Sequence, residues 1–147
     1  MAVDNKALQI REVLQEKIEA EYALIYQTNL DRDMPSVDWR SDKVNIISLF
    51  SGCGGLDLGF ELAGLSAVIG EEQAIKAFHS KEDFYALRDQ SVFHTIYTID
   101  SFKEANQTYT WNFPTTCQHT SDIRKVPHFP KADLVIGGFP CTGFSEA

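Results

Sequence analysis

The sequence has few cysteines, no long apolar run and no signal-peptide core. Its 147 residues include three cysteines, Cys53, Cys117 and Cys141, whose odd number and scattered spacing argue against a disulfide framework and a zinc cluster. Reduced thiols suit a cytoplasmic protein. No segment is long enough to cross a bilayer. We therefore expect a cytoplasmic protein with neither a metal nor a membrane among its partners.

Basic side chains are also scarce. The chain has 13 Lys and Arg against 21 Asp and Glu, a formal net charge of −8. Proteins that grip nucleic acid usually show a basic patch, so this chain is not the main phosphate-binding surface of a DNA-binding protein. Hydrophobic residues make up 44% and aromatic residues 12%, which is enough for one buried core and too much for a disordered chain.

The first 43 residues form an N-terminal extension made of a helix and a linker. Over residues 4–28, apolar side chains recur at helical spacing, and Asp4 is placed to cap the helix. The recurring side chains are Ile10, Leu14, Ile18, Tyr22 and Ile25. Residues 29–42 are polar and read as a linker. We favour packing of this helix on the following domain over the alternative, a surface for a partner chain.

Residues 44–147 form a second region that opens with a strand, a turn and a helix. Val44–Phe50 is an apolar, β-branched run typical of a central parallel strand. After a glycine-rich turn, Leu56, Phe60 and Ala63 share one helical face, and Gly64 is placed to end the helix. This is the first unit of a doubly wound α/β domain.

In the rest of this region, predicted strands continue to alternate with predicted helices. Strands are predicted over residues 94–100 and 132–137, and helices over residues 73–80 and 102–111. Such alternation predicts a parallel sheet that binds ligands at the carboxyl ends of its strands.

The glycine-rich turn, Phe50–Gly55, is a candidate ligand site. Gly52, Gly54 and Gly55 allow a sharp turn and a close approach of a ligand to the backbone. The following helix would direct free N–H groups at a carboxylate or phosphate. The turn could serve NAD, FAD, a nucleotide or S-adenosylmethionine, or no ligand at all. The absence of GxGxxG and of a GK[ST] ending argues against dinucleotide and P-loop ligands.

Two segments of the second region resemble one family. Ile47–Gly64, ISLFSGCGGLDLGFELAG, resembles the first signature of cytosine-5 DNA methyltransferases, and Val135–Ser145, VIGGFPCTGFS, resembles their catalytic signature. The resemblance covers residues 44–147. It implies a Rossmann-like, S-adenosylmethionine-dependent methyltransferase fold of which the chain holds the first half.

The resemblance also implies how S-adenosylmethionine would bind. Phe50 would lie beside the adenine, and the backbone of Ser51, Gly52, Cys53, Gly54 and Gly55 would line the amino-acid end. An acidic residue after the second strand would hold the ribose hydroxyls, since a carboxylate can accept from both.

We expect that acid to be Asp100 rather than Glu71 or Glu72, which makes residues 71–93 an insertion. Ser101 stands where the family often has a bulky residue. The remaining cofactor residues implied by the resemblance are Asp122 and Ile123, near the adenine amino group, and Gly138.

The resemblance identifies Cys141 as the nucleophile, with Pro140 fixing the backbone beside it. A thiolate that adds to C6 of cytosine pushes electron density to C5, which can then attack a methyl sulfonium; loss of the C5 proton and expulsion of the sulfur complete the reaction. The target base must leave the duplex to reach the thiol. Thr142 replaces the usual Gln. We interpret Cys53 as a small apolar filler and find no supporting context for Cys117.

Some parts of the family pattern are missing from the chain, namely a glutamate general acid and the target-recognition region. We therefore expect weak cofactor binding and no methylation by the chain alone. The expected partners are double-stranded DNA, bound mainly through absent regions, and the C-terminal remainder or a second subunit. The leading interpretation is the N-terminal portion of a DNA (cytosine-5-)-methyltransferase of a bacterial restriction–modification system. Rivals are a tRNA-directed relative, a non-catalytic regulatory or split subunit, and a nicotinamide oxidoreductase.

Overall fold

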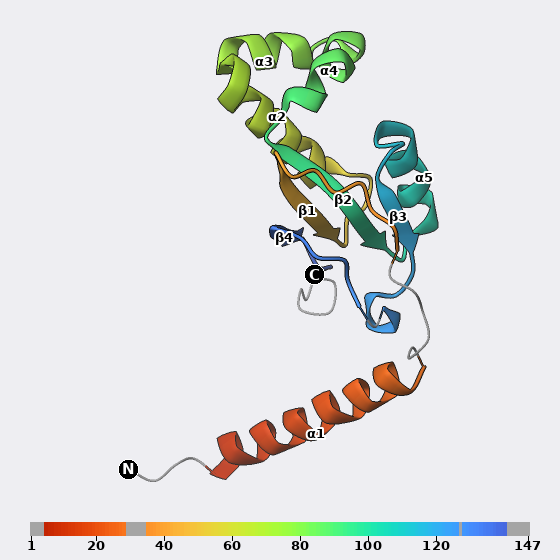
Figure 1. The fold of residues 1–147 in the computed structure, drawn as a ribbon. Helices are drawn as coiled ribbons and strands as arrows, with labels where there is room; N and C mark the ends of the chain where they lie inside the picture. The colour runs from red at the N-terminus through yellow and green to blue at the C-terminus, as the bar shows by residue number, and fades with distance from the viewer. Residues whose placement is uncertain (1–4, 29–34, 127, 141–147) are drawn as a thin grey trace. The chain divides into compact units, whose positions relative to one another are not determined.

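A computed structural model describes residues 5–28, 35–126 and 128–140. The chain divides into two units: helix α1 (Asn5–Thr28) belongs to the first, and a parallel sheet with helices belongs to the second (Figure 1). Among the described residues, no helix combines the length and the hydrophobicity that a membrane span requires.

Helix α1 confirms the helix predicted from the apolar periodicity, whereas Asp4, its predicted cap, lies outside the described residues. The periodic side chains leave an apolar stripe exposed along the helix. Its described members are Ile10, Val13, Leu14, Ile18 and Tyr22. Packing of this stripe on the following domain stays a prediction.

The sheet of the second unit has four parallel strands in the order β3-β2-β1-β4. They are β1 (Val44–Leu49), β2 (Phe93–Asp100), β3 (Cys117–Thr120) and β4 (Leu134–Gly137). Leu49 pairs with Gly137 and Asp100 pairs with Thr120. The carboxyl ends of all four strands therefore lie at one edge, as the α/β prediction required. Strand β3 was not predicted, and Cys117 lies in it.

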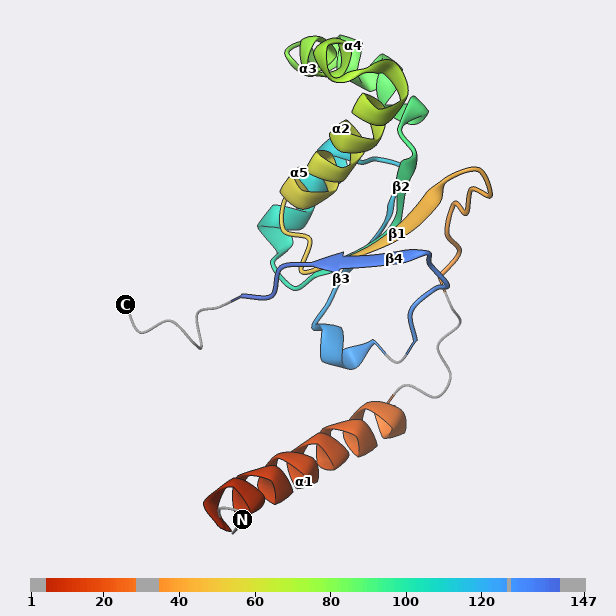
Figure 2. The same cartoon turned by 90° about the vertical axis from the view of Figure 1, so that its left-hand side faces the viewer.

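Helices α2 (Gly55–Ile69) and α5 (Lys103–Asn112) cover the same face of the sheet, as Figure 2 shows. Helices α3 (Glu71–Phe78) and α4 (Lys81–Leu87) follow at the far end of α2, before the short 3₁₀ turn η1 (Arg88–Gln90). A second 3₁₀ turn, η2 (Ile123–Lys125), follows β3. Leu65, Ala74 and Phe84 form a buried cluster that joins α2, α3 and α4. The predicted insertion is thus a helical layer packed on α2.

The prediction that Gly64 ends its helix is wrong. Helix α2 continues to Ile69 and ends at Gly70, which has φ +90°. Gly64 is buried inside the helix, where an added Cβ would overlap Ser91 Oγ and lie 2.8 Å from a ring carbon of Phe93. This glycine therefore permits close packing and does not break the helix.

The buried face of α2 also differs from the predicted one. Leu56 is 47% exposed, and Ala63 is exposed too, whereas Asp57 and Leu65 are fully buried. Apolar spacing alone does not indicate a buried carboxylate, so sequence reasoning missed Asp57.

Candidate cofactor site at the carboxyl edge of the sheet

The glycine-rich turn between β1 and α2 has an unusual backbone. Gly52 and Gly54 have φ of +53° and +90°, as the glycine pattern predicts, but Phe50 also has φ 54°. A left-handed conformation costs a non-glycine residue about 1–2 kcal/mol. Such strain persists where surrounding structure enforces it, and it clusters at ligand sites.

Asp100 holds one side of this turn. Its Oδ2 accepts a hydrogen bond from the Gly52 N–H at 2.9 Å, and its Oδ1 accepts from the Phe102 N–H at 2.8 Å. A carboxylate has about four acceptor positions, so the two oxygens retain capacity for the hydroxyls of a ligand. The structure therefore brings Asp100 and the turn together, 48 residues apart in sequence.

Glu71 and Glu72, the alternative acids, lie elsewhere. They begin α3 at the far end of α2, a helix of 15 residues. At 1.5 Å per residue, that helix separates them from the turn by about 22 Å. The geometry favours Asp100 as the ligand-binding acid.

The glycines of the turn face two different surroundings. A Cβ added at Gly54 would lie 2.5 Å from Phe113 and 3.0 Å from Tyr109, so Gly54 packs against the protein. A Cβ added at Gly52 or Gly55 would meet no atom of the described residues within 4 Å. A ligand can therefore approach the backbone at both positions.

Two further features of the turn suit a polar ligand. The Ser51 Oγ is buried and has no hydrogen-bond partner within the described part of the chain. The first N–H groups of α2 lack intrahelical acceptors, and they carry the positive end of the helix dipole. A carboxylate-bearing ligand fits this arrangement.

The other predicted cofactor residues come from the neighbouring strand ends. The Ser121 N–H donates to the Asp100 carbonyl at 3.1 Å, and Asp122 and Ile123 follow directly, both half-buried. Ser101 is exposed, and so is Phe102, at 62%. Because they follow the carboxyl ends of β2 and β3, these four residues lie at the same edge of the sheet as the turn.

Strand β4 ends at this edge, and the predicted catalytic residues follow it in sequence. Because Gly137 pairs with Leu49, Gly138 and Pro140 continue beyond the strand next to the turn, and both are exposed. Cys141 lies outside the described residues. No group of three metal-ligating side chains occurs among the residues that the structure describes.

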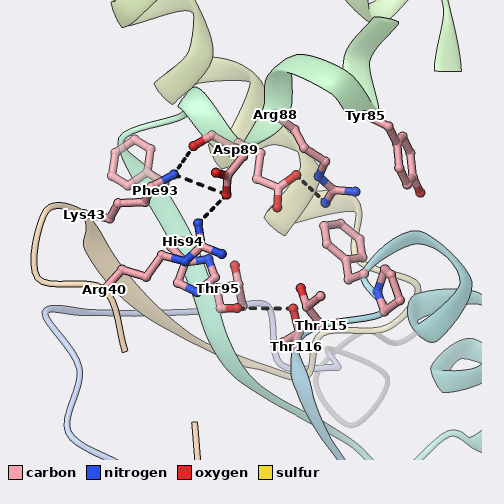
Figure 3. Close-up of a pocket in the computed structure, with 13 residues that line it drawn as sticks. Arg40, Lys43, Tyr85, Arg88, Asp89, Phe93, His94, Thr95, Thr115 and Thr116 are labelled. Carbon is pink, nitrogen blue, oxygen red and sulfur yellow. Dashed lines mark hydrogen bonds and ion pairs between the residues drawn. The ribbon is translucent and has the colours of Figure 1, made fainter. Parts of the chain in front are cut away.

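A cavity of about 210 Å³ lies at the opposite edge of the sheet, where β2 and β3 begin (Figure 3). Its charged side chains are paired: Arg40 and Lys43 with Asp89, and Arg88 with Glu61. The bond to Arg40 is the main cause that lowers the pKa of Asp89, while burial raises the pKa of Glu61 against the opposing effect of Arg88. Because the cavity lies where the strands begin and the glycine-rich turn lies where they end, the cavity is a poor candidate for the cofactor site.

A second cavity, of about 350 Å³, lies on the helix side of the turn. It is lined by Cys53, Gly54, Gly55 and by side chains of α2 to α5, but by neither Asp100 nor Asp122. The lining of this cavity therefore does not include the residues predicted to hold the ribose and the adenine amino group.

A turn between a strand and a helix, held by an acid at the end of the next parallel strand, is typical of nucleotide-type ligand sites in α/β proteins. Comparison with known proteins makes this class specific. The family model for C-5 cytosine-specific DNA methylases matches residues 44–147, and the chain belongs to this family. The predicted family and the α/β methyltransferase fold are thus confirmed.

The chain is similar to several bacterial methyltransferases. It is 57% identical to the type II methyltransferase M.BsuRI of Bacillus subtilis over 148 residues, covering 99% of this chain and 34% of the relative. It is 49% identical to M.BspRI of Lysinibacillus sphaericus, covering 95% of this chain and 33% of the relative. M.NgoPII of Neisseria gonorrhoeae is 38% identical over 71% of this chain and 23% of its own length. The chain spans about a third of the length of the first two relatives.

Proposed function

We propose that this chain is the cofactor-binding and nucleophile-bearing part of a DNA (cytosine-5-)-methyltransferase that acts in a restriction–modification system in the bacterial cytoplasm. Family membership and the type II methyltransferases among its relatives support this proposal. The observation that carries it is the bond from the Gly52 N–H to Asp100, because it joins the turn to an acid at the strand ends. The relatives favour DNA over tRNA as the substrate.

The proposed cofactor is S-adenosylmethionine, which supplies an activated methyl group when bound. Ser51 to Gly55 would face its amino-acid end with backbone N–H groups, and Asp100 would accept from the ribose hydroxyls. Phe50, Ser101, Asp122, Ile123 and Gly138 would surround the adenine and the rest of the cofactor. The open space beside Gly52 and Gly55 gives the ligand access to the backbone.

Cys141 would supply the nucleophile, with Pro140 restricting the backbone before it. Its thiolate would add to C6 of a cytosine flipped out of the duplex and leave again after C5 has lost its proton. A net charge of −8 indicates that the chain needs other regions of the protein for most of its contacts with DNA phosphates.

A titration with S-adenosylhomocysteine tests the cofactor assignment. Chemical shifts of the amide groups, which report weak binding, would be followed in the isolated chain and in two variants. Asp100→Asn removes one charged acceptor, and we expect an affinity loss of about 10- to 100-fold, since a hydrogen bond to a charged group contributes about 1.5–3 kcal/mol. The matched control Glu72→Gln should bind like the unchanged chain. Equal losses in both variants, or preferential binding of NAD, would contradict the assignment.

A transfer assay tests the need for other regions. The isolated chain, DNA and tritiated S-adenosylmethionine should give no incorporation, because the chain spans only about a third of the length of the related methyltransferases. Robust methylation by the chain alone would refute that expectation.

A further inference from the structure

The buried carboxylate of Asp57 connects three elements behind the glycine-rich turn. Asp57 is the third residue of α2 and is 0% exposed. It accepts a hydrogen bond from Ser48 Oγ of β1 at 2.8 Å and another from the Tyr109 hydroxyl of α5 at 3.2 Å. Burial raises the pKa of Asp57, and the bond from Ser48 opposes this effect. An ionised carboxylate at this position is therefore costly, and an apolar side chain would fill the space without that cost.

Tyr109 connects Asp57 to the turn, because its hydroxyl binds Asp57 and its ring lies against Gly54. Its ring is fully buried and stacks on Phe113, with centroids 4.5 Å apart and planes inclined by 28°. Both rings lie directly against Gly54, whose backbone has φ +90°. Burial raises the pKa of Tyr109 far above its ordinary value, so the hydroxyl stays protonated and remains a donor. The bond to Asp57 fixes the position of the ring that supports the turn.

The turn is thus held from two sides. On one side Asp100 accepts from the Gly52 N–H, and on the other the rings of Tyr109 and Phe113 contact Gly54. The Gly54 N–H donates to the Ser51 carbonyl at 2.9 Å, which closes the turn between these two supports.

We propose that Asp57 and Tyr109 are positioning residues that set the backbone geometry of the glycine-rich turn and thereby its affinity for the cofactor. The inference rests on the proposed function of the turn. Neither side chain needs to touch the cofactor, because both act through the backbone at Gly54. The hydrogen bonds that Asp57 accepts from Ser48 and Tyr109 give this buried carboxyl group a role that an apolar side chain would not fill.

The matched variants Tyr109→Phe and Tyr97→Phe test this inference. Each removes one hydroxyl from a fully buried ring and leaves the ring in place. The Tyr109 hydroxyl binds Asp57, whereas the Tyr97 hydroxyl pairs with His119 Nδ1 at 2.8 Å, away from Gly54. Both variants should lose stability, so a purely structural role predicts similar behaviour.

Two readouts separate the roles, namely amide hydrogen exchange at Gly52 and Gly54 in the free chain and affinity for S-adenosylhomocysteine. For Tyr109→Phe, relative to Tyr97→Phe, we expect about tenfold faster exchange at Gly54 and about tenfold weaker binding, equivalent to about 1.4 kcal/mol. Asp57→Asn, which keeps one acceptor oxygen in place of two, should give the same two changes.

Identical exchange and affinity in the two tyrosine variants would overturn the inference. A failure of the proposed function looks different: the unchanged chain would bind no S-adenosylhomocysteine, and glycine exchange alone would then decide whether Tyr109 positions the turn.

Discussion

Replacement of Gly54 by alanine should damage the fold more than any comparable change in the glycine-rich turn. The new Cβ would lie 2.5 Å from Phe113 and 3.0 Å from Tyr109, two buried rings that stack on each other and have little room to move. The backbone at Gly54 also has φ +90°, a conformation that alanine rarely adopts. Two independent penalties therefore act at this position.

The magnitude follows from these two penalties. Left-handed backbone costs a residue with a Cβ about 1–2 kcal/mol, and overpacking of a tight core costs about 1–3 kcal/mol. Gly54→Ala should thus lower the free energy of unfolding by about 2–5 kcal/mol. Since a typical domain is stable by about 5–15 kcal/mol, the variant should remain folded only marginally or at lower temperature.

Two other glycines serve as controls for Gly54→Ala. Gly52→Ala has φ +53° but an open surrounding, so it should cost only the backbone penalty of about 1–2 kcal/mol. Gly59 lies inside α2, and its Cβ would meet nothing within 4 Å among the described residues, so Gly59→Ala should stabilise the chain by about 0.5–1 kcal/mol.

Urea denaturation followed by near-ultraviolet circular dichroism would measure these differences, because that signal reports aromatic packing. From most to least stable, the expected order is Gly59→Ala, the unchanged chain, Gly52→Ala and Gly54→Ala. Cofactor binding should respond differently, since Gly52→Ala places a methyl group in the space proposed for the ligand. A Gly54→Ala variant as stable as Gly52→Ala would refute the ring contact behind the turn.

Three further predictions concern buried or anchoring charges. Because burial raises the pKa of Asp57 in the folded chain, stability should fall as the pH rises from the ordinary aspartate pKa through the raised one, and denaturation of Asp57→Asn should lack this dependence. Hydrogen bonds from Asn45 lower the pKa of Asp133, so its effect on stability should have the opposite pH dependence. The stabilisation is present above the ordinary aspartate pKa and is lost as the pH falls through the lowered pKa. Asp133→Asn should not show this loss. Arg88→Met should cost about 3–5 kcal/mol because it leaves the half-buried Glu61 unpaired, and adding Glu61→Gln should restore part of the loss in urea denaturation. A double variant no more stable than Arg88→Met alone would show that the ion pair is not the cause.

Much of the fold was predictable because it depends on local pattern. The apolar runs of β1 and β4 indicated buried strands, the alternating and β-rich pattern of β2 indicated another strand, and the glycines between β1 and α2 indicated a sharp turn. Asp100 was preferred over Glu71 because the segment after it matched the family helix, and its bond to Gly52 agrees with that choice. Family membership followed from the same residues.

Strand β3 was missed for a physical reason. Its four residues, Cys117–Thr120, are polar or weakly apolar and show no periodicity. Their strand conformation depends on hydrogen bonds to β2, for instance the pairing of Thr120 with Asp100. A single sequence does not reveal such a partner when the segment itself has no apolar run.

The sequence by itself determined the class of fold, the order of its main elements, the glycine-rich turn and the family of the chain, since these follow from residue types at short spacing. Only the tertiary structure decided which distant residues meet: Asp57 with Tyr109, 52 positions apart, and Gly54 with the rings that support it. Such contacts arise when helices on one face of the sheet pack side by side, and the buried hydrogen bonds between them depend on that packing and not on local propensity.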